Sequence, residues 1–304
     1  MIEVKNLTKK FDKFTAIQNI SLKIGEGSIY GLAGYNGAGK TTLIKTIAGI
    51  YKPDEGKALL DGENSYDSNV ARERLFFVPD DIFFLPGATM DSMAKFYRGY
   101  YPHFSKIVFE RISKLFDLDT KKRIRGFSKG MQRQAEIALA LASRPKNMLM
   151  DECFDGLDPA KRILAKKLFI EYAAESECSM FISSHNLSEL AELCDHVGLI
   201  NGKTLVLDSD IYDIGRDYRK YQVVFTSDTD KNSLATALSE VCAFKRLELE
   251  GRAAAFTAKG SVADIRARLA AFRPANCEEF PLTLEEVFIY EMEDEKHDVT
   301  KIFE

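Results

Sequence analysis

The sequence predicts an α/β fold built around a phosphate-binding loop, followed by a small α+β module. Three observations support this prediction. An apolar strand, a Gly-rich turn and a helix follow one another near the N-terminus. Apolar strands then alternate with helical segments to about residue 207, and after about residue 215 the order becomes β-α-β-β-α-β. With 304 residues, two domains are expected, and we place them at residues 1–214 and 215–304.

The phosphate-binding loop is the stretch GYNGAGKTT, from Gly34 to Thr42. It follows the apolar run 28–33 and precedes a helical segment that ends before Gly49. In the pattern G-x-x-x-x-G-K-[ST], the glycines allow backbone N–H groups to converge on phosphate, and the helix adds its positive N-terminus. We expect Lys40 to reach the β- and γ-phosphates and the Thr41 hydroxyl to bind Mg²⁺.

The composition limits which partners the chain is expected to bind and which cellular compartment it is expected to occupy. The net charge of −4 and the pI near 5.8 give no electrostatic case for a nucleic-acid partner or an anionic lipid surface. No apolar run approaches the roughly 20 residues that span a bilayer, and the N-terminus enters strand-like alternation without a signal peptide. The five cysteines are scattered and form no C-x-x-C motif, which indicates reduced thiols in a cytoplasm.

A helical insertion is expected at about residues 81–145. It is rich in aromatic residues, and helical periodicity runs from Met90 to Tyr97 and from Ile107 to Phe116. These aromatic residues have two possible roles: they form an internal core, or some of them line a docking groove for a partner protein. Two fates also stay open for Phe11, in the turn-rich connection Thr8–Lys13, because its ring could stack on adenine or pack in the core.

Further along the chain, polar residues gather at strand and helix ends. Ser128 is placed to cap an Ala/Leu-rich helix that runs to about residue 143. The apolar strand 147–150 leads into Asp151 and Glu152. Two acids at the end of a buried strand need a cation to hold or a proton to carry. The next apolar strand, 179–182, ends just before His185.

These ordered motifs resemble those of the ATP-binding subunit of an ATP-binding cassette (ABC) transporter of the exporter type, over about residues 1–210. GYNGAGKTT is like the family's Walker A, FSKGM occupies the place of its signature, MLMDE is like Walker B, DGLD like the D-loop and SSH like the switch histidine. The resemblance implies a P-loop NTPase cassette with a mixed sheet core and a helical insertion. It also implies a head-to-tail dimer, in which each ATP lies between the Walker A of one subunit and the Ser128 loop of the other.

The resemblance implies a role for each matching residue. Glu152 is expected to act as general base, His185 to contact the γ-phosphate, and Asp151 to hold Mg²⁺ together with Thr41. The residues expected to bind ATP are Phe11, Gly34, Asn36, Gly37, Ala38, Gly39, Lys40, Thr41, Thr42, Ser128, Gly130 and Asp158. The implied partners are a separate integral-membrane permease and a second ATP-binding subunit, which we expect to be an identical copy. The chain would then work at the cytoplasmic face of the membrane.

The sequence departs from the family pattern in two places. Asp80 stands near the position of a glutamine that senses Mg²⁺, and Cys153 replaces the proline after the catalytic glutamate. Asp80 is either a Mg²⁺ ligand or a cap of the turn after Pro79. Two other functions also stay open: an importer ATPase, and a soluble ABC ATPase associated with DNA or ribosomes.

The C-terminal segment 215–304 carries no recognisable catalytic cluster. Strands are expected at 221–225, 244–249, 253–258 and 277–281, with helices at 231–241 and 262–272. This order indicates a small ferredoxin-like α+β module. We expect it to mediate contact between the two subunits, and we expect a final helix from about residue 282 and a frayed, charged end at 293–304.

Overall fold

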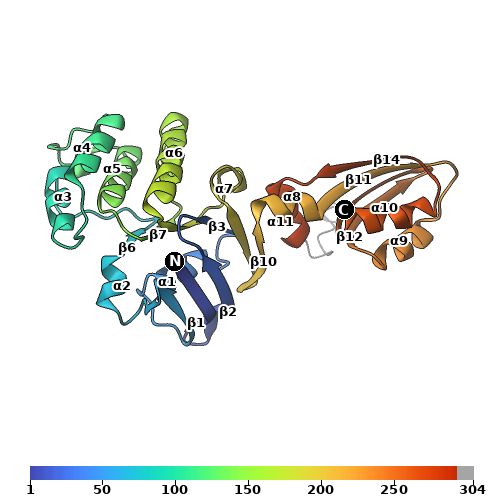
Figure 1. Cartoon of the computed structure of the whole chain (residues 1–304), viewed down its shortest axis with the longest axis horizontal. Helices are drawn as coiled ribbons and strands as arrows, with labels where there is room; N and C mark the ends of the chain where they lie inside the picture. The colour runs from blue at the N-terminus through green and yellow to red at the C-terminus, as the bar shows by residue number, and fades with distance from the viewer. Residues whose placement is uncertain (293–304) are drawn as a thin grey trace, which may run out of the picture. The chain divides into compact units, whose positions relative to one another are not determined.

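The computed structural model describes residues 1–292, and Figure 1 shows the course of the chain. The chain divides into two compact units, Met1–Asp208 and a second unit that begins at Ser209. The expected fraying of residues 293–304 lies outside the described residues. No helix among the described residues is long and apolar enough to span a membrane.

The central layer of the first unit is a six-stranded sheet of order β10-β9-β3-β8-β7-β6. The pairs β3–β8, β3–β9, β7–β8 and β6–β7 are parallel. The buried strands β3, β7 and β8 therefore end at one edge of the sheet, where the polar residues expected from the sequence follow them. The strands are β3 (Ile29–Gly34), β6 (Leu75–Val78), β7 (Asn147–Asp151), β8 (Ser179–Ser183), β9 (His196–Asn201) and β10 (Thr204–Asp210).

A second, antiparallel sheet of order β2-β1-β4-β5 faces the first across one helix. Its strands are β1 (Ile2–Phe11), β2 (Phe14–Ile24), β4 (Glu55–Leu60) and β5 (Glu63–Asn64). Helix α1 (Lys40–Ile47) buries Leu43, Ile44 and Ile47 in one core together with residues of both sheets. The phosphate-binding loop is thus fixed at both ends, because β3 lies in the central sheet and α1 lies between the two sheets.

The predicted insertion at about 81–145 contains three α-helices and a short 3₁₀ helix, and the α-helices gather at one end of the first unit (Figure 1). They are α3 (Met90–Arg98), α4 (Lys106–Leu115) and α5 (Lys129–Ala142). Each begins where a hydroxyl accepts a backbone N–H: Thr89 for α3, Ser105 for α4 and Ser128 for α5. The remaining helical segments of this unit are α2 (Asn69–Glu73), the short 3₁₀ helix Ile124–Gly126, α6 (Pro159–Ser176) and α7 (Leu187–Leu193).

The second unit has the predicted element order β-α-β-β-α-β. All pairs in its four-stranded sheet, of order β12-β13-β11-β14, are antiparallel, which is the connectivity of a split β-α-β fold. Leu234, Leu238, Ile265 and Leu269 of its two inner helices pack on the sheet. Its elements are α8 (Ile211–Asp217), β11 (Tyr218–Phe225), α9 (Lys231–Ser239), β12 (Ala243–Glu250), β13 (Ala253–Lys259), α10 (Val262–Ala270), β14 (Pro274–Pro281) and α11 (Leu284–Met292).

Candidate nucleotide-binding site

The loop between β3 and α1 requires glycine at its end. Gly39 precedes the first residue of α1 with φ of 108°, in the region that favours glycine. A Cβ at this position would lie 2.7 Å from the carbonyl oxygen of Ala16, on the neighbouring strand β2. A side chain here would therefore displace the loop from the antiparallel sheet.

Lys40 is the first residue of α1, and its side chain is only 7% exposed. Its Nζ donates to the carbonyl oxygen of Gly34 at 2.8 Å and to that of Tyr35 at 3.4 Å, and lies 3.9 Å from Oε1 of Glu152. The ammonium group thus lies between the loop backbone and the acid at the end of β7. A cavity of about 230 Å³ adjoins it, lined by Phe14, Ala16, Tyr35, Asn36, Gly37, Gly39, Lys40, Thr41, Thr42, Asp80 and Glu152.

Asp151 has one carboxylate oxygen available for a cation. The residue is 1% exposed, and its Oδ1 accepts a 2.5 Å hydrogen bond from Oγ of Ser183 on β8. Its Oδ2 is buried and has no hydrogen-bond partner among the described residues. A buried carboxylate oxygen without a partner is costly unless a cation binds it. The unpartnered Asp151 oxygen, and the hydroxyl of Thr41, which lines the cavity, are oxygen donors of the kind that Mg²⁺ prefers.

Glu152 is held in a constrained conformation at the same edge of the sheet. Its φ of 49° lies in the left-handed region, which non-glycine residues adopt at a cost. Its backbone N–H donates to the carbonyl oxygen of Ser183. Its Oε2 lies 2.9 Å from Nδ1 of His185 and accepts the backbone N–H of His185 at 3.3 Å. Glu152 and His185, which follow two neighbouring parallel strands, are thus in direct contact.

Burial raises the pKa of the Glu152 carboxyl, and the hydrogen bond from His185 and the charges of His185 and Lys40 oppose that shift. A carboxylate with a raised pKa at a cavity is suited to accept a proton near neutral pH. Asp155 lies in the same cluster, since ligand atoms of Glu152, Asp155 and His185 lie within 4.8 Å of one another. Sequence reasoning missed Asp155, although a third acid so soon after Asp151 and Glu152 was a usable signal.

Asp80 and Phe14 line the cavity, whereas Phe11 does not. Phe11 and Phe14 pair across the tip of the β1–β2 hairpin. The Phe11 ring packs edge-on against Tyr51 with centroids 5.3 Å apart, whereas Phe14 is 58% exposed. From the sequence, a turn-rich connection was expected at Thr8–Lys13. Strand β1 instead continues to Phe11, and this leaves two aromatic residues at the hairpin tip as candidates for adenine contact.

Three further predicted residues lie away from this cavity. Oγ of Ser128 accepts the backbone N–H of Met131 at the start of α5, as expected for a helix cap. The carboxylate of Asp158 caps α6 through the backbone N–H of Lys161, at 3.0 Å. A Cβ on Gly130 would lie 2.4 Å from the carbonyl oxygen of Gly156. The first turn of α5 therefore packs directly on the turn that leads into α6.

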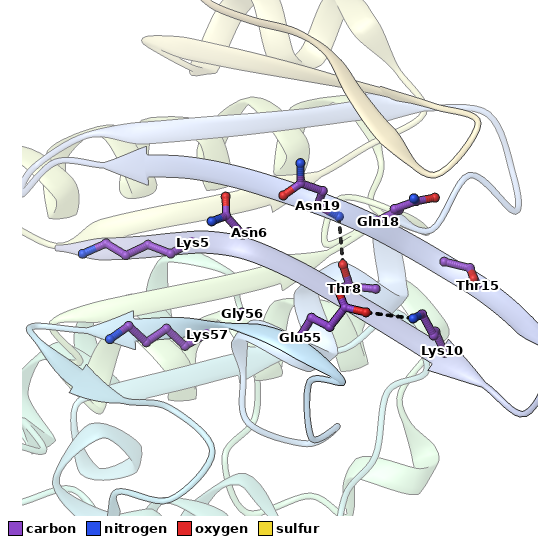
Figure 2. A pocket seen from close by; sticks show the side chains of 10 residues that line it. All are labelled: Lys5, Asn6, Thr8, Lys10, Thr15, Gln18, Asn19, Glu55, Gly56 and Lys57. Atoms are coloured by element: carbon purple, nitrogen blue, oxygen red, sulfur yellow. Dashed lines mark hydrogen bonds and ion pairs between the residues drawn. The ribbon is translucent and has the colours of Figure 1, made fainter.

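A larger hollow, of about 810 Å³, lies on the antiparallel sheet, and Figure 2 shows its lining. Lys5 and Lys57 are register partners on β1 and β4, and Lys10 forms an ion pair with Glu55 at 2.8 Å. The hollow contains none of the phosphate-loop residues and no buried acid or histidine. We therefore assign the nucleotide to the smaller cavity, where Lys40, Thr41 and Glu152 meet.

A parallel sheet whose strand ends place an acid and a histidine beside a phosphate loop defines a P-loop nucleotide-binding protein. Residues 17–155 match the family model described as ABC transporter. YtrB of Bacillus subtilis (strain 168), an ABC transporter ATP-binding protein, is 29% identical over 95% of this chain and 97% of its own length. BcrA of Enterococcus faecalis, a bacitracin transport ATP-binding protein, is 32% identical over 75% of each chain.

Two further matches concern the fold and the direction of transport. A solved structure of an ATP-binding subunit of an ABC transporter is 25% identical, with a TM-score of 0.64, and covers 71% of this chain and 92% of its own. The methionine import ATP-binding protein MetN 1 of Listeria innocua is 30% identical over 70% of this chain and 68% of its own length. The chain belongs to the ATP-binding proteins of the ABC transporter family. It is an ABC-type ATP hydrolase and the ATP-binding subunit of a transporter.

Proposed function

We propose that this chain hydrolyses Mg²⁺-bound ATP to drive export through a separate membrane permease. The observation that carries the proposal is the position of the Glu152 carboxylate, 3.9 Å from the Lys40 ammonium and 2.9 Å from His185, at the edge of the phosphate-loop cavity. Lys40 and the N-terminus of α1 would stabilise the phosphate groups. Glu152 would accept a proton from the attacking water, and His185 would orient Glu152 and contact the γ-phosphate.

Asp151, Thr41 and Asp80 are the residues that would hold Mg²⁺. The unpartnered Oδ2 of Asp151 and the cavity position of Asp80 support this assignment. When bound, the ion supplies positive charge that neutralises the phosphate oxygens. For adenine, we propose the hairpin tip that carries Phe11 and Phe14, because Phe14 lines the cavity and Phe11 lies across from it.

We propose that two copies of the chain bind ATP between them. Ser128 and Gly130 lie away from the chain's own phosphate-loop cavity, at the exposed N-terminus of α5. A helix N-terminus is a good anion site, so this end of α5 is available to a nucleotide on a second copy. Asp158, which caps α6, would sit at the same interface. The variant Ser128→Arg should therefore prevent ATP-dependent dimerisation while leaving ATP binding to each monomer intact.

We propose the helical insertion as the permease contact. Leu85 and Phe96 line an open hollow there and are 42% and 40% exposed. Tyr100, which is 63% exposed, packs against Phe96 with ring centroids 4.9 Å apart. Exposed apolar residues in a cluster are typical of protein interfaces. Other aromatic residues form an internal cluster, because Phe76 packs against Tyr97 and Tyr101. The aromatics of this region therefore include both core residues and exposed residues that could contact a partner.

Export is favoured by the relatives named for bacitracin transport and peptide export, and import is the second candidate because of the methionine import relative. The test is co-expression with candidate permeases, chosen as polytopic membrane proteins from the same organism. Co-purification should be lost in a Phe96→Ser/Tyr100→Ser variant and kept in a Tyr212→Ser control, since Tyr212 is 82% exposed in the second unit. Substrate uptake into inside-out vesicles would establish export; release from them would establish import.

For the second unit we propose a role in contact between two copies. The second unit contributes no residue to the nucleotide cavity and none of the acids or the histidine assigned to the site, as far as residue 292. Its described residues have a hydrophobic core of their own. Within residues 1–292, the edge strands β12 and β14 each have one side without a partner strand, and such edges readily pair with another chain. A chain that ends at Asp210 should still bind ATP but dimerise more weakly in sedimentation; equal dimerisation would refute this role.

A further inference from the structure

Arg133 is a fully buried cation outside the residues assigned so far. It lies in α5, one and a half turns beyond Ser128, and its side chain is 0% exposed. A buried guanidinium is costly unless its charge is paired and its donors are hydrogen-bonded; Nε of Arg133 has no hydrogen-bond partner among the described residues, whereas both Nη atoms have partners. Nη1 donates to the carbonyl oxygen of Pro79 at 2.6 Å and to Oε2 of Glu136 at 2.8 Å, and Nη2 donates to the carbonyl oxygen of Asp80 at 2.6 Å.

The two carbonyl groups belong to the segment that leaves β6 and carries Asp80 to the nucleotide cavity. Pro79 has no N–H to donate. Among residues 1–292, no backbone–backbone hydrogen bond outside helices and strands involves residues 79–84. The side chain of Arg133 therefore provides the hydrogen bonds that hold this segment at the position where Asp80 lines the cavity.

Glu136 completes the arrangement from the next turn of α5. Its carboxyl is 8% exposed and forms an ion pair with Arg133 at 2.8 Å. Burial raises its pKa to about 7, with the Arg133 charge and hydrogen bond opposing the shift. The buried charge of Arg133 is thus matched by one acid and two carbonyl dipoles, and the guanidinium fork faces both neighbouring carbonyls at once.

We propose that Arg133 is a positioning residue that ties the Asp80 segment to α5, so that the cation-binding side of the cavity moves together with the helix that begins at Ser128. This inference rests on the proposed function. Arg133 does not itself line the cavity, and its hydrogen bonds to this segment are to the backbone carbonyl oxygens of Pro79 and Asp80. If a second copy displaced α5, Asp80 of the same chain would then move with that helix.

The variant Arg133→Lys tests this. Lysine keeps the charge beside Glu136, but it lacks the rigid planar fork that places Nη1 and Nη2 on two separate carbonyl oxygens. We expect kcat to fall about 10- to 100-fold, because small misplacements of a reacting group have such effects, and the Mg²⁺ concentration for half-maximal rate to rise. ATP affinity should be unchanged. Glu136→Gln keeps the fork on both carbonyls and should stay within about twofold of the parent.

Two measurements separate positioning from a merely structural role. In an Asp80→Ala background, Arg133→Lys should cause almost no further loss of kcat, since both changes act on one carboxylate; an equal loss in both backgrounds would overturn the proposal. Cleavage by chymotrypsin after Phe83, which is 71% exposed in this segment, should accelerate in Arg133→Lys and not in Glu136→Gln. An unchanged cleavage rate would also overturn the proposal, and this readout holds even if the parent protein proves not to hydrolyse ATP.

Discussion

Nδ1 of His185 lies 2.9 Å from Oε2 of Glu152, so the switch histidine and the acid that we assign as general base share a hydrogen bond. Burial raises the pKa of Glu152, and His185 opposes that shift. The base must be ionised to accept a proton, so its pKa sets the acid limb of the kcat/KM profile.

His185→Ala should move the acid limb of kcat/KM to higher pH, because it removes the hydrogen bond and charge that lower the pKa of Glu152. The measurement is the pH profile of ATP hydrolysis under subsaturating ATP. His185→Gln, which keeps an amide donor in reach, should move the limb less. An acid limb that stays in place in His185→Ala would show that Glu152 is not the group titrating.

Asp80→Gln should lower the Mg²⁺ concentration that ATP hydrolysis requires without abolishing activity. Asp80 lines the cavity, where a negative charge would repel the γ-phosphate unless a divalent cation lies between them. A glutamine amide removes that repulsion and still offers an oxygen ligand. An unchanged Mg²⁺ titration would favour the alternative that Asp80 caps the turn after Pro79.

Glu136 should make stability depend on pH. Its pKa rises from 4.5 to about 7 on folding, so the folded state binds more protons than the unfolded state in this window. The free energy of unfolding of the parent, relative to Glu136→Gln, should therefore be greatest below pH 4.5 and fall by roughly 3 kcal/mol as the pH rises to about 7. Urea titrations of both proteins across this range measure it; a pH-independent difference would contradict the raised pKa.

Much of this arrangement followed from sequence because local signals coincided with the fold. The Gly-rich loop lies between a buried strand and a helix, and Asp151, Glu152 and His185 follow strands that pair in parallel, so their positions along the sheet edge were predictable. The β-α-β-β-α-β order of the second unit was predictable from alternation and turn residues.

Other features depend on contacts that spacing does not encode. Arg133 binds carbonyls 53 and 54 residues earlier in the chain, and nothing local marks it as buried. Strand β1 runs through Thr8–Lys10, where polar residues and register shifts obscure the alternation. The short helices α2 and α8 were missed because five to seven residues carry too little periodicity.

The most direct measurement is single-turnover ATP hydrolysis by Glu152→Gln, compared with Lys40→Ala. Glutamine keeps the size of the side chain but cannot accept the proton, so hydrolysis should slow by about 10²-fold or more while ATP still binds and accumulates in a dimer. Lys40→Ala should instead weaken ATP binding itself, because its ammonium lies among the loop carbonyls. Near-normal turnover in Glu152→Gln would contradict the assignment of Glu152 as the base.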